Sequence, residues 1–544
     1  MISAPLPRSS ASHSFGSWVW LIPGVCVALI VAAPIFYLFL SWGQVDQQLW
    51  QHLLDTQLLR LISNTVILVV AVAIGTTLVG VSLAWLTALC DFPGRAWMDW
   101  ALMLPLAIPP YVFAFVVLGI FDFGGVFQNS LGRIFPQYIG GDARSTGMLV
   151  LVMTSVLYPY VYLLTRNIFL MQGRAAFDVA RSLGASPFEA AWRVALPMAR
   201  PGIIAGVSLV MMETLADFGA VSVFNYDTFT TAIYKSWISL FSLATASQLA
   251  SLLLLFVISV IMLERTTRGR GRIEQKSTRT ELFQLKGIAA VAASGWCLLV
   301  LALAFALPVA QLISWVANSA SNSGIFSAIF SSSTLRLIQN TFVLALGSAL
   351  AIVAIVFLIN LSVRQNKNAS VFSEIAGLGY ALPGSVLAVG IVAVSAHLDD
   401  LFSGPATDGF LVGGLLGLFF AYLIRFYRPA NSPIESAMAR LRPELGESAQ
   451  SLGASKMRIA GKIYLPMLTP GILAAMLLAM IDIMKEMPAT LMLRPFGWDT
   501  LATQIYSLTS EAEWQRAAAP ALILIAVSCV PVIMLIRQSL SGNR

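Results

Sequence analysis

Long apolar stretches constrain this sequence more than any other feature, because twelve of them approach or exceed the length of a membrane-crossing helix. The hydrocarbon core of a bilayer is about 30 Å thick, and about 20 apolar residues span it as a helix. Only 11% of the 544 residues are charged and 58% are hydrophobic, whereas soluble domains contain about 25% charged residues. These values exclude a water-soluble enzyme and predict an all-α polytopic membrane protein with about 12 transmembrane helices. The expected spans are 18–41, 61–89, 99–121, 147–166, 198–217, 243–263, 288–313, 338–361, 375–396, 409–427, 467–484 and 518–537.

The basic residues between the spans predict the orientation, because cytoplasmic loops are enriched in Lys and Arg. If the N-terminus is cytoplasmic and the spans alternate, 25 of the 33 Lys and Arg residues lie on the cytoplasmic side and eight lie outside. Both termini are therefore expected in the cytoplasm. The basic run 265–286 is interpreted as a solvated cytoplasmic linker, so the net charge of +7 requires no nucleic-acid partner.

The sequence contains an internal duplication in which the two copies run in the same direction. Residues 178–186 read Asp-Val-Ala-Arg-Ser-Leu-Gly-Ala-Ser, and residues 447–455 read Glu-Ser-Ala-Gln-Ser-Leu-Gly-Ala-Ser. We expect two homologous halves of six spans each, 1–270 and 287–544, joined by a cytoplasmic linker at 271–286. Parallel repeats imply a pseudo-two-fold axis along the membrane normal, with a translocation pathway between the halves.

The repeated segment predicts a cytoplasmic elbow in each half. Gly184 and Gly453 stand where a helix would end in a left-handed residue. Ser186 and Glu189 then form a capping-box pattern that restarts a helix. The second copy keeps the serine but has Arg458 in place of the glutamate, so a weaker restart is expected there.

This doubled loop resembles the EAA loop of binding-protein-dependent ABC importer permeases. The resemblance implies the type I ABC importer permease fold, with coupling loops 175–197 and 444–466 that dock on a separate ATPase dimer. In the first copy Asp178-Val179 replaces the usual Glu-Ala, which makes the two docking sites unequal. The residues that match the motif and are expected to couple to the ATPase are Asp178, Ala180, Gly184, Glu447, Ala449 and Gly453.

The nucleotide itself is expected to bind elsewhere. The sequence has no Gly-x-x-x-x-Gly-Lys-Ser/Thr stretch, which is the loop that cradles nucleotide phosphates. We therefore expect a transport subunit that is not an enzyme and holds no cofactor, with ATP and Mg bound by the partner ATPase.

Two pairs of acidic residues occur at matching places within or beside the fifth span of each half. Glu213 and Asp217 correspond to Asp482 and Glu486, and the spacing i, i+4 places each pair on one helix face. Acids inside spans are usually functional, and hard cations prefer oxygen ligands. The pairs are thus candidates for an acidic ring lining a cation pathway, without a fixed metal site. Two alternatives are open: the acids face water at helix ends, or Lys485 neutralises Asp482.

The residues around these acids resemble the ferric-iron branch of the same permeases. The resemblance rests on segments 213–231 and 482–503, including the string Lys485-Glu486-Met-Pro-Ala-Thr-Leu. It implies a permease in the bacterial inner membrane that receives Fe(III) from a periplasmic binding protein. Related branches carry thiamine, phosphonates or polyamines, and these substrates are alternatives.

A different class of transporter is also compatible with twelve spans in two parallel halves. A proton-coupled secondary carrier would use intramembrane acids as proton relays and would need no ATPase. The doubled cytoplasmic elbow argues against it. A membrane-embedded enzyme has no support, because no nucleophile–base or metal-ligand constellation is found in the sequence.

Overall fold

The computed structural model describes residues 19–121, 143–172, 182–184, 186, 189, 191–267, 283–320, 332–401 and 414–541. Helices dominate these residues, and one pair of two-residue strands, β1 (Cys90–Asp91) and β2 (Phe283–Gln284), is present among them. The chain is therefore an all-α polytopic protein, as predicted. The helices of the first half are α1 (Ile22–Leu40), α2 (Gln47–Leu53), α3 (Leu59–Leu89), α4 (Arg95–Ala101), α5 (Pro110–Phe121), α7 (Thr146–Gln172), α10 (Leu196–Ala216), α11 (Gly219–Val223), α12 (Phe229–Ile238) and α13 (Leu243–Thr267).

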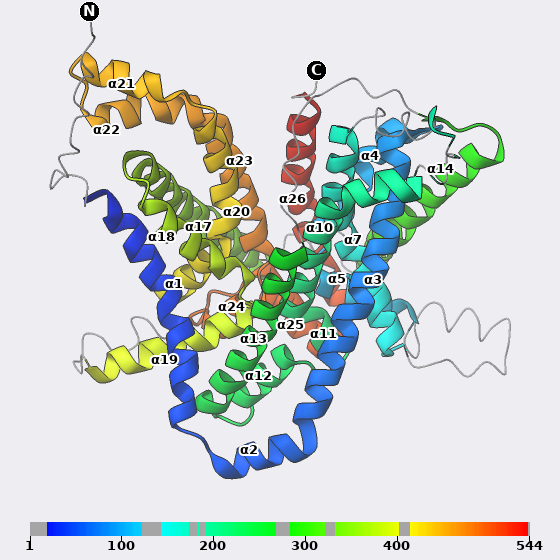
Figure 1. The fold of residues 1–544 in the computed structure, drawn as a ribbon. Coiled ribbons are helices and arrows are strands. Elements are labelled where there is room, and N and C mark those ends of the chain that lie inside the picture. Colours follow the sequence, from blue (N-terminus) through cyan, green and yellow to red (C-terminus); the bar gives the residue numbers. More distant parts are fainter. Residues whose placement is uncertain are drawn as a thin grey trace, which may run out of the picture. The chain divides into compact units, whose positions relative to one another are not determined.

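The second half repeats this pattern of long helices followed by short ones (Figure 1). The fifth long helix of each half is followed by two short helices, α11 and α12 or α24 and α25. The helices of the second half are α14 (Ile288–Leu301), α15 (Leu307–Ala320), α17 (Ser332–Gln365), α18 (Ala369–Leu378), α19 (Gly384–Leu401), α20 (Leu415–Ala439), α21 (Pro443–Ser451), α22 (Lys456–Ile459), α23 (Leu465–Lys485), α24 (Pro488–Leu493), α25 (Leu501–Ser510) and α26 (Trp514–Ser541).

Eight helices in the described part are long and apolar enough to cross a membrane, or ten if each of two bent pairs counts as one span. Single helices cover eight of the predicted spans, and the bent pairs cover 99–121 and 375–396. The first pair, Arg95–Ala107 and Pro110–Phe121, is bent by 89°. The two remaining predicted spans, 409–427 and 518–537, overlap α20 and the apolar segment Trp514–Val530 of α26, which are not among these helices.

The third span of each half was expected to be one continuous helix, and prolines explain why it is broken. The first break is at Ile108–Pro109, and the second is at the matching Leu382–Pro383. Proline lacks a backbone N–H, and its ring disfavours helical geometry in the residue before it. Each of these spans therefore consists of two helical segments rather than one.

The chain forms two compact units, which do not coincide with the two sequence halves. The smaller unit comprises residues 1–33, 346–380 and 422–480, and the larger unit comprises the rest. In the smaller unit, Trp20 of the first half packs on a core that includes Leu361, Tyr464 and Leu468 of the second half. Helix α1 thus begins among helices of the opposite half. The division into halves at 271–286 remains a prediction about the sequence repeat.

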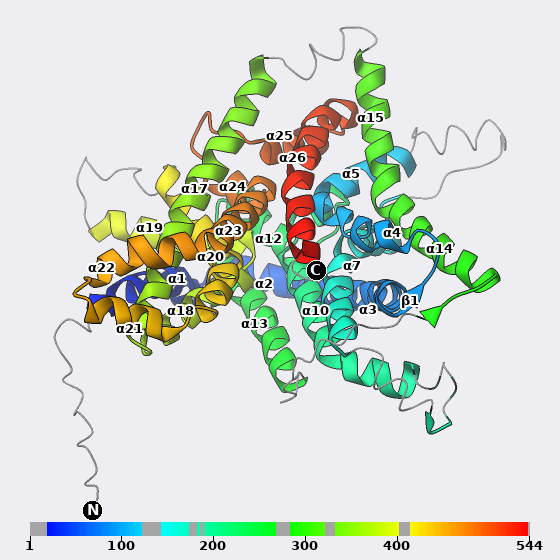
Figure 2. The ribbon, with the colours of Figure 1, turned by 90° about the horizontal axis from the view of Figure 1, so that it is seen from above.

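The larger unit contains the reciprocal exchange, because α14 of the second half packs against helices of the first. The Ser294 hydroxyl donates to the Pro93 carbonyl at 2.9 Å, and the Trp296 indole donates to the Ser82 hydroxyl at 3.1 Å. In the same unit α3, α7 and α10 lie side by side (Figures 1 and 2). The first helix of each half therefore contributes to the core of the other.

The interpretation of 265–286 as a solvated linker is wrong at its C-terminal end. Strand β2 pairs with β1 in parallel, and the Leu285 N–H donates to the Asp91 carbonyl at 3.0 Å. Phe283 of the strand and Leu285, the residue after it, pack against the core cluster that contains the buried Leu89 and Cys90. Residues 268–282 lie outside the described residues.

Candidate functional site

The second predicted elbow forms a helical hairpin in the smaller unit, where α21 and α22 are joined by Gly453 (Figure 1). Glu447 and Ala449 lie on α21. Gly453 has φ +83° with no atom near the position of a Cβ, which is the left-handed conformation expected of a glycine after a helix. The Ala454 N–H donates to the Ala449 carbonyl at 3.0 Å and closes the end of α21.

The restart of the chain after each glycine is also as predicted. In the first elbow, which belongs to the larger unit, Ser186 N–H donates to Glu189 Oε2 at 3.0 Å and Glu189 N–H donates to Ser186 Oγ at 3.2 Å. This is a complete capping box. In the second elbow the Arg458 N–H donates to Ser455 Oγ at 3.3 Å, which is half of such a box.

The first elbow is only partly described, because Asp178 and Ala180 lie outside the described residues. Gly184 is described and has φ +91°, so both glycines adopt the predicted left-handed conformation. The hydrogen bonds from Ser186, and then the nearby Arg193, lower the pKa of Glu189 below its ordinary value. The carboxylate of this box is therefore ionised at neutral pH.

An apolar tip on each elbow was not singled out from the sequence. Leu183 is 82% exposed and Leu452, at the equivalent repeat position, is 88% exposed. Each leucine precedes the left-handed glycine of its elbow. The repeated string Ser-Leu-Gly-Ala-Ser contained this signal, since an apolar residue held at a tight polar turn has no neighbour to bury it. A single exposed leucine is ordinary on a protein surface, so it is the repetition in both elbows that makes this tip a candidate contact surface.

A cation anchors the second elbow inside the smaller unit. Arg364, at the end of α17, donates to the carbonyl groups of Met438, Leu441 and Arg442 at 3.1–3.3 Å. These carbonyls lie at the end of α20, where a helix leaves acceptors without partners. The Arg364 guanidinium also lies 4.7 Å from the centre of the Tyr464 ring. Such a contact adds a cation–π attraction, so the elbow is held at both of its ends.

One acid of each intramembrane pair caps a short helix, and both lie in the larger unit. Asp217 follows α10 and accepts a hydrogen bond from the Val221 N–H of α11 at 3.1 Å. Glu486 follows α23 and accepts from the Ala489 N–H at 3.1 Å and from the Thr490 N–H and hydroxyl at 2.9 Å. The repeat has conserved the same structural relationship, in which a carboxylate lies at the positive end of the next helix.

The Glu486 carboxylate is also tightly enclosed. Glu486 is 6% exposed. A Cβ added at Gly384, the first residue of α19, would collide with Glu486 Oε1. Only glycine therefore allows α19 to approach this carboxylate so closely. The position of Glu486 is fixed by hydrogen bonds and by packing.

The other two acids, Glu213 and Asp482, are half-buried. Both lie close enough to Lys485 for an electrostatic interaction with its ammonium group. In the described part of the chain, no group of three or more His, Cys, Asp or Glu side chains is arranged to hold a metal ion. The expected acidic ring is therefore not assembled as a metal-binding group here, and the four acids remain a prediction for the pathway.

The segments that follow the acids are fixed by a second repeated arrangement. Thr228 and Thr231 form a capping box at α12, and Thr500 and Thr503 form one at α25. Asn64 and Asn340, in the repeated Asn-Thr pairs, each reach these segments. Asn64 Nδ2 donates to the Asp227 carbonyl and Asn340 Nδ2 donates to the Asp499 carbonyl, each at 3.0 Å.

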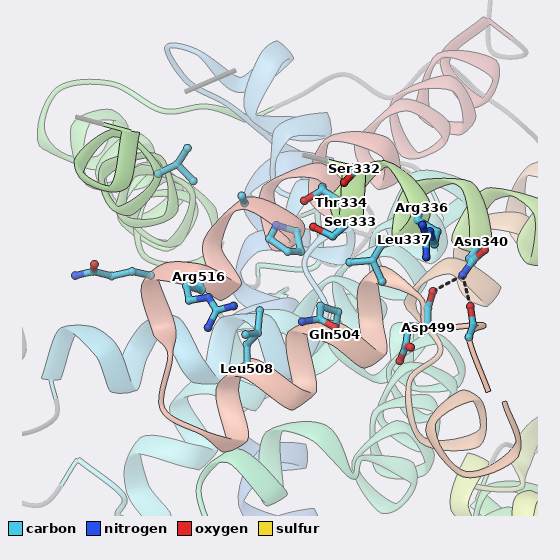
Figure 3. Close-up of a pocket in the computed structure, with 15 residues that line it drawn as sticks. Ser332, Ser333, Thr334, Arg336, Leu337, Asn340, Asp499, Gln504, Leu508 and Arg516 are labelled. Carbon is cyan, nitrogen blue, oxygen red and sulfur yellow. Dashed lines mark hydrogen bonds between the residues drawn. The ribbon is translucent and has the colours of Figure 1, made fainter. Parts of the chain in front are cut away.

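A pocket of about 540 Å³ lies beside the second of these arrangements, entirely within the larger unit (Figure 3). Arg60 pairs with Asp227 at 2.8 Å, whereas Asp499 pairs with Arg494. Arg336, the repeat counterpart of Arg60, is instead exposed in the pocket. Figure 3 shows Arg336 and Arg516 on opposite sides of it, with Gln504 between them.

Comparison with known proteins identifies the repeat. The family described as "Binding-protein-dependent transport system inner membrane component" matches residues 77–263 and 366–541, once in each half. The chain is 28% identical over 528 residues to the Fe(3+)-transport system permease protein FbpB 2 of Haemophilus influenzae, which covers 95% of this chain and 97% of that protein.

Two further relatives match a shorter part of the chain. The sulfate transport system permease protein CysW of Escherichia coli is 32% identical over 213 residues, which are 39% of this chain and 72% of that protein. The molybdate/tungstate transport system permease protein WtpB of Thermococcus kodakarensis is 29% identical over 203 residues, which are 37% of this chain and 75% of that protein. These lengths correspond to a single half, so the chain resembles two such permeases joined end to end.

Proposed function

Because this chain belongs to the family of binding-protein-dependent transport system inner membrane components, we propose that its cargo is Fe(III) delivered by a soluble periplasmic binding protein. It is the permease subunit of an ABC importer and a multi-pass inner-membrane protein. The observation that carries the iron proposal is the similarity to an Fe(3+) permease over 95% of the chain, including both halves. The sulfate and molybdate relatives match less than half of it.

The energy source in this proposal is a separate ATPase dimer that docks on the two elbows. The support is physical: each elbow has a left-handed glycine, a serine cap and an exposed leucine at its tip. A rigid turn with an apolar tip can enter a cleft and transmit a push. ATP and Mg bind to that partner, and this chain supplies the path. Both termini lie in the cytoplasm with the elbows, as the distribution of basic residues indicates.

The binding protein is proposed to dock on the periplasmic side of the membrane, near the pocket that contains Arg336 and Arg516. Two guanidinium groups and the amide of Gln504 suit carboxylate side chains on a soluble partner. The acids Glu213, Asp217, Asp482 and Glu486 are proposed to lie along the path of the cation. Asp217 and Glu486 cap α11 and α24, so contact with the cation is assigned to Glu213 and Asp482.

A substrate panel tests the iron proposal. The permease is reconstituted with its ATPase and binding protein, and ATP-driven uptake of radiolabelled Fe(III) is measured with thiamine, a phosphonate, a polyamine or sulfate present in excess. The expected result is that iron is taken up and that none of these compounds lowers the rate of its uptake. If one of these compounds inhibits iron uptake and is itself taken up, that compound is the cargo instead of iron.

A further inference from the structure

The break in the third span leaves a carbonyl group that the local helix cannot satisfy. In a helix, the Leu106 carbonyl would accept from the backbone N–H three or four residues later. Those positions are Pro109 and Pro110, and proline has no N–H. An unpaired carbonyl in an apolar setting is unfavourable, so a donor from elsewhere is needed.

Lys485 supplies that donor from a distant part of the chain. Its Nζ donates to the Leu106 carbonyl at 2.8 Å. Lys485 is the last residue of α23, and the residue at the matching repeat position in α10 is Ala216. The second half therefore places an ammonium group at the break in the third span of the first half. Ala216, at the matching position of the first half, has no charged group to place at the break in the second half.

The same ammonium group lies among the acids of the proposed pathway. Asp482 is one helical turn before it on α23, and both Asp482 and Glu213 interact with it electrostatically. The carboxylates of Asp217 and Glu486 accept backbone hydrogen bonds from α11 and α24. The Leu106 carbonyl thus fixes the Lys485 amine beside two acids that lie along the proposed path of the cargo.

We propose that Lys485 is a resident counter-cation that keeps small cations out of the pathway and yields its place beside Asp482 and Glu213 to the cargo. The tether to Leu106 holds the ammonium group in position while the permease is idle. The helical segment Lys456–Lys485 begins within the second elbow, at the first residue of α22, so a push on that elbow acts on the helix that carries Lys485. This role rests on the proposed function, because it requires a cationic cargo.

The test is the leak of small cations through the permease in the absence of ATP. Proteoliposomes containing the complete importer are loaded with a Mn²⁺-quenched dye, and Mn²⁺ entry is compared with chloride entry. Removal of the resident charge makes the surroundings of Asp482 and Glu213 more negative by one unit, which concentrates cations locally and raises their entry by about tenfold or more. We expect this for Lys485→Met, with chloride entry unchanged, and entry close to wild type for Lys485→Arg.

Two controls separate a selective role from damage to the fold. Lys235→Met removes a lysine of α12 that is paired with Asp227. This substitution is expected to leave Mn²⁺ entry unchanged. Lys485→Met combined with Asp482→Asn is expected to return entry toward the wild-type rate. Equal Mn²⁺ entry in wild type and Lys485→Met, or a parallel rise in chloride entry, would overturn the proposal. A failure of the iron assignment would appear separately, as absent ATP-driven Fe(III) uptake by the wild-type importer.

Discussion

Ser186 and Glu189 each donate a backbone N–H to the side chain of the other, at 3.0 and 3.2 Å. At the equivalent place in the second elbow, Ser455 Oγ accepts from the Arg458 N–H. The arginine side chain has no acceptor atom for the Ser455 N–H. The two elbows are thus closed by different numbers of hydrogen bonds, although their sequences are repeats of each other.

This difference predicts that Arg458→Glu will strengthen the second elbow. The substitution places a carboxylate at the third helical position, where it can accept the Ser455 N–H and complete the box. Hydrogen–deuterium exchange of the peptide around residues 453–460 should become slower. Ser455→Ala should have the opposite effect, with a loss of about 1 kcal/mol in local stability. Faster exchange in Arg458→Glu would contradict the account of the box.

The left-handed glycines predict a loss of coupling on substitution. Gly184→Val and Gly453→Val place a branched side chain at φ +91° and +83°, a conformation that is unfavourable by roughly 1–2 kcal/mol for residues with a Cβ. We expect ATP hydrolysis to lose most of its stimulation by substrate. Gly461→Ala is the matched control, because Gly461 lies in a helical segment with open space around it. Full stimulation in both valine variants would show that the elbows do not transmit force.

The exposed leucines predict the strength of ATPase binding. Burial of a leucine side chain contributes about 1.5–3 kcal/mol, so Leu183→Asp or Leu452→Asp should weaken ATPase binding by at least tenfold. Leu183→Met and Leu452→Met keep the apolar surface and should bind as the wild type does. Binding is measured with the purified ATPase and the permease in detergent. Equal affinity of all four variants would place the docking surface elsewhere.

The four intramembrane acids are predicted to separate into two functional pairs. Asp217→Ala and Glu486→Ala remove the caps of α11 and α24, and we expect a lower melting temperature for each purified variant. The Glu486 variant loses bonds worth on the order of 3 kcal/mol in sum. Glu213→Gln and Asp482→Asn should lower the melting temperature less than the two alanine variants do, but should reduce iron uptake. If all four variants retain both stability and uptake, the acids line no pathway.

The turn of each elbow was predictable because the contacts that shape it are local, whereas the anchoring of the second elbow by Arg364 joins distant residues. The glycine, the serine cap and the glutamate lie within six residues of one another, so their spacing determines the turn. The fold class was predictable for a similar reason, since a membrane helix satisfies its own backbone groups. The broken third spans had a signal as well, in Pro109-Pro110 and Pro383-Gly384, that outweighs their apolar length.

Contacts between distant residues could not be predicted in this way. The hydrogen bond from Lys485 to Leu106 joins positions 379 residues apart, and nothing in either segment specifies the other. The same holds for the exchange of α1 and α14 between the halves, and for β2, whose Phe283 and Leu285 were counted as part of a basic linker. The caps at Asp217 and Glu486 depend on two short helices that apolar length alone does not reveal.

We propose that this permease imports a cation with energy from a partner ATPase. The test is uptake of radiolabelled Fe(III) into proteoliposomes that contain the permease, the ATPase and the binding protein, with either ATP or a pH gradient as the only energy source. Uptake should require ATP, the ATPase and the binding protein, and a pH gradient should not replace ATP. Uptake by the permease alone, driven by the pH gradient, would contradict the proposal and identify a proton-coupled carrier.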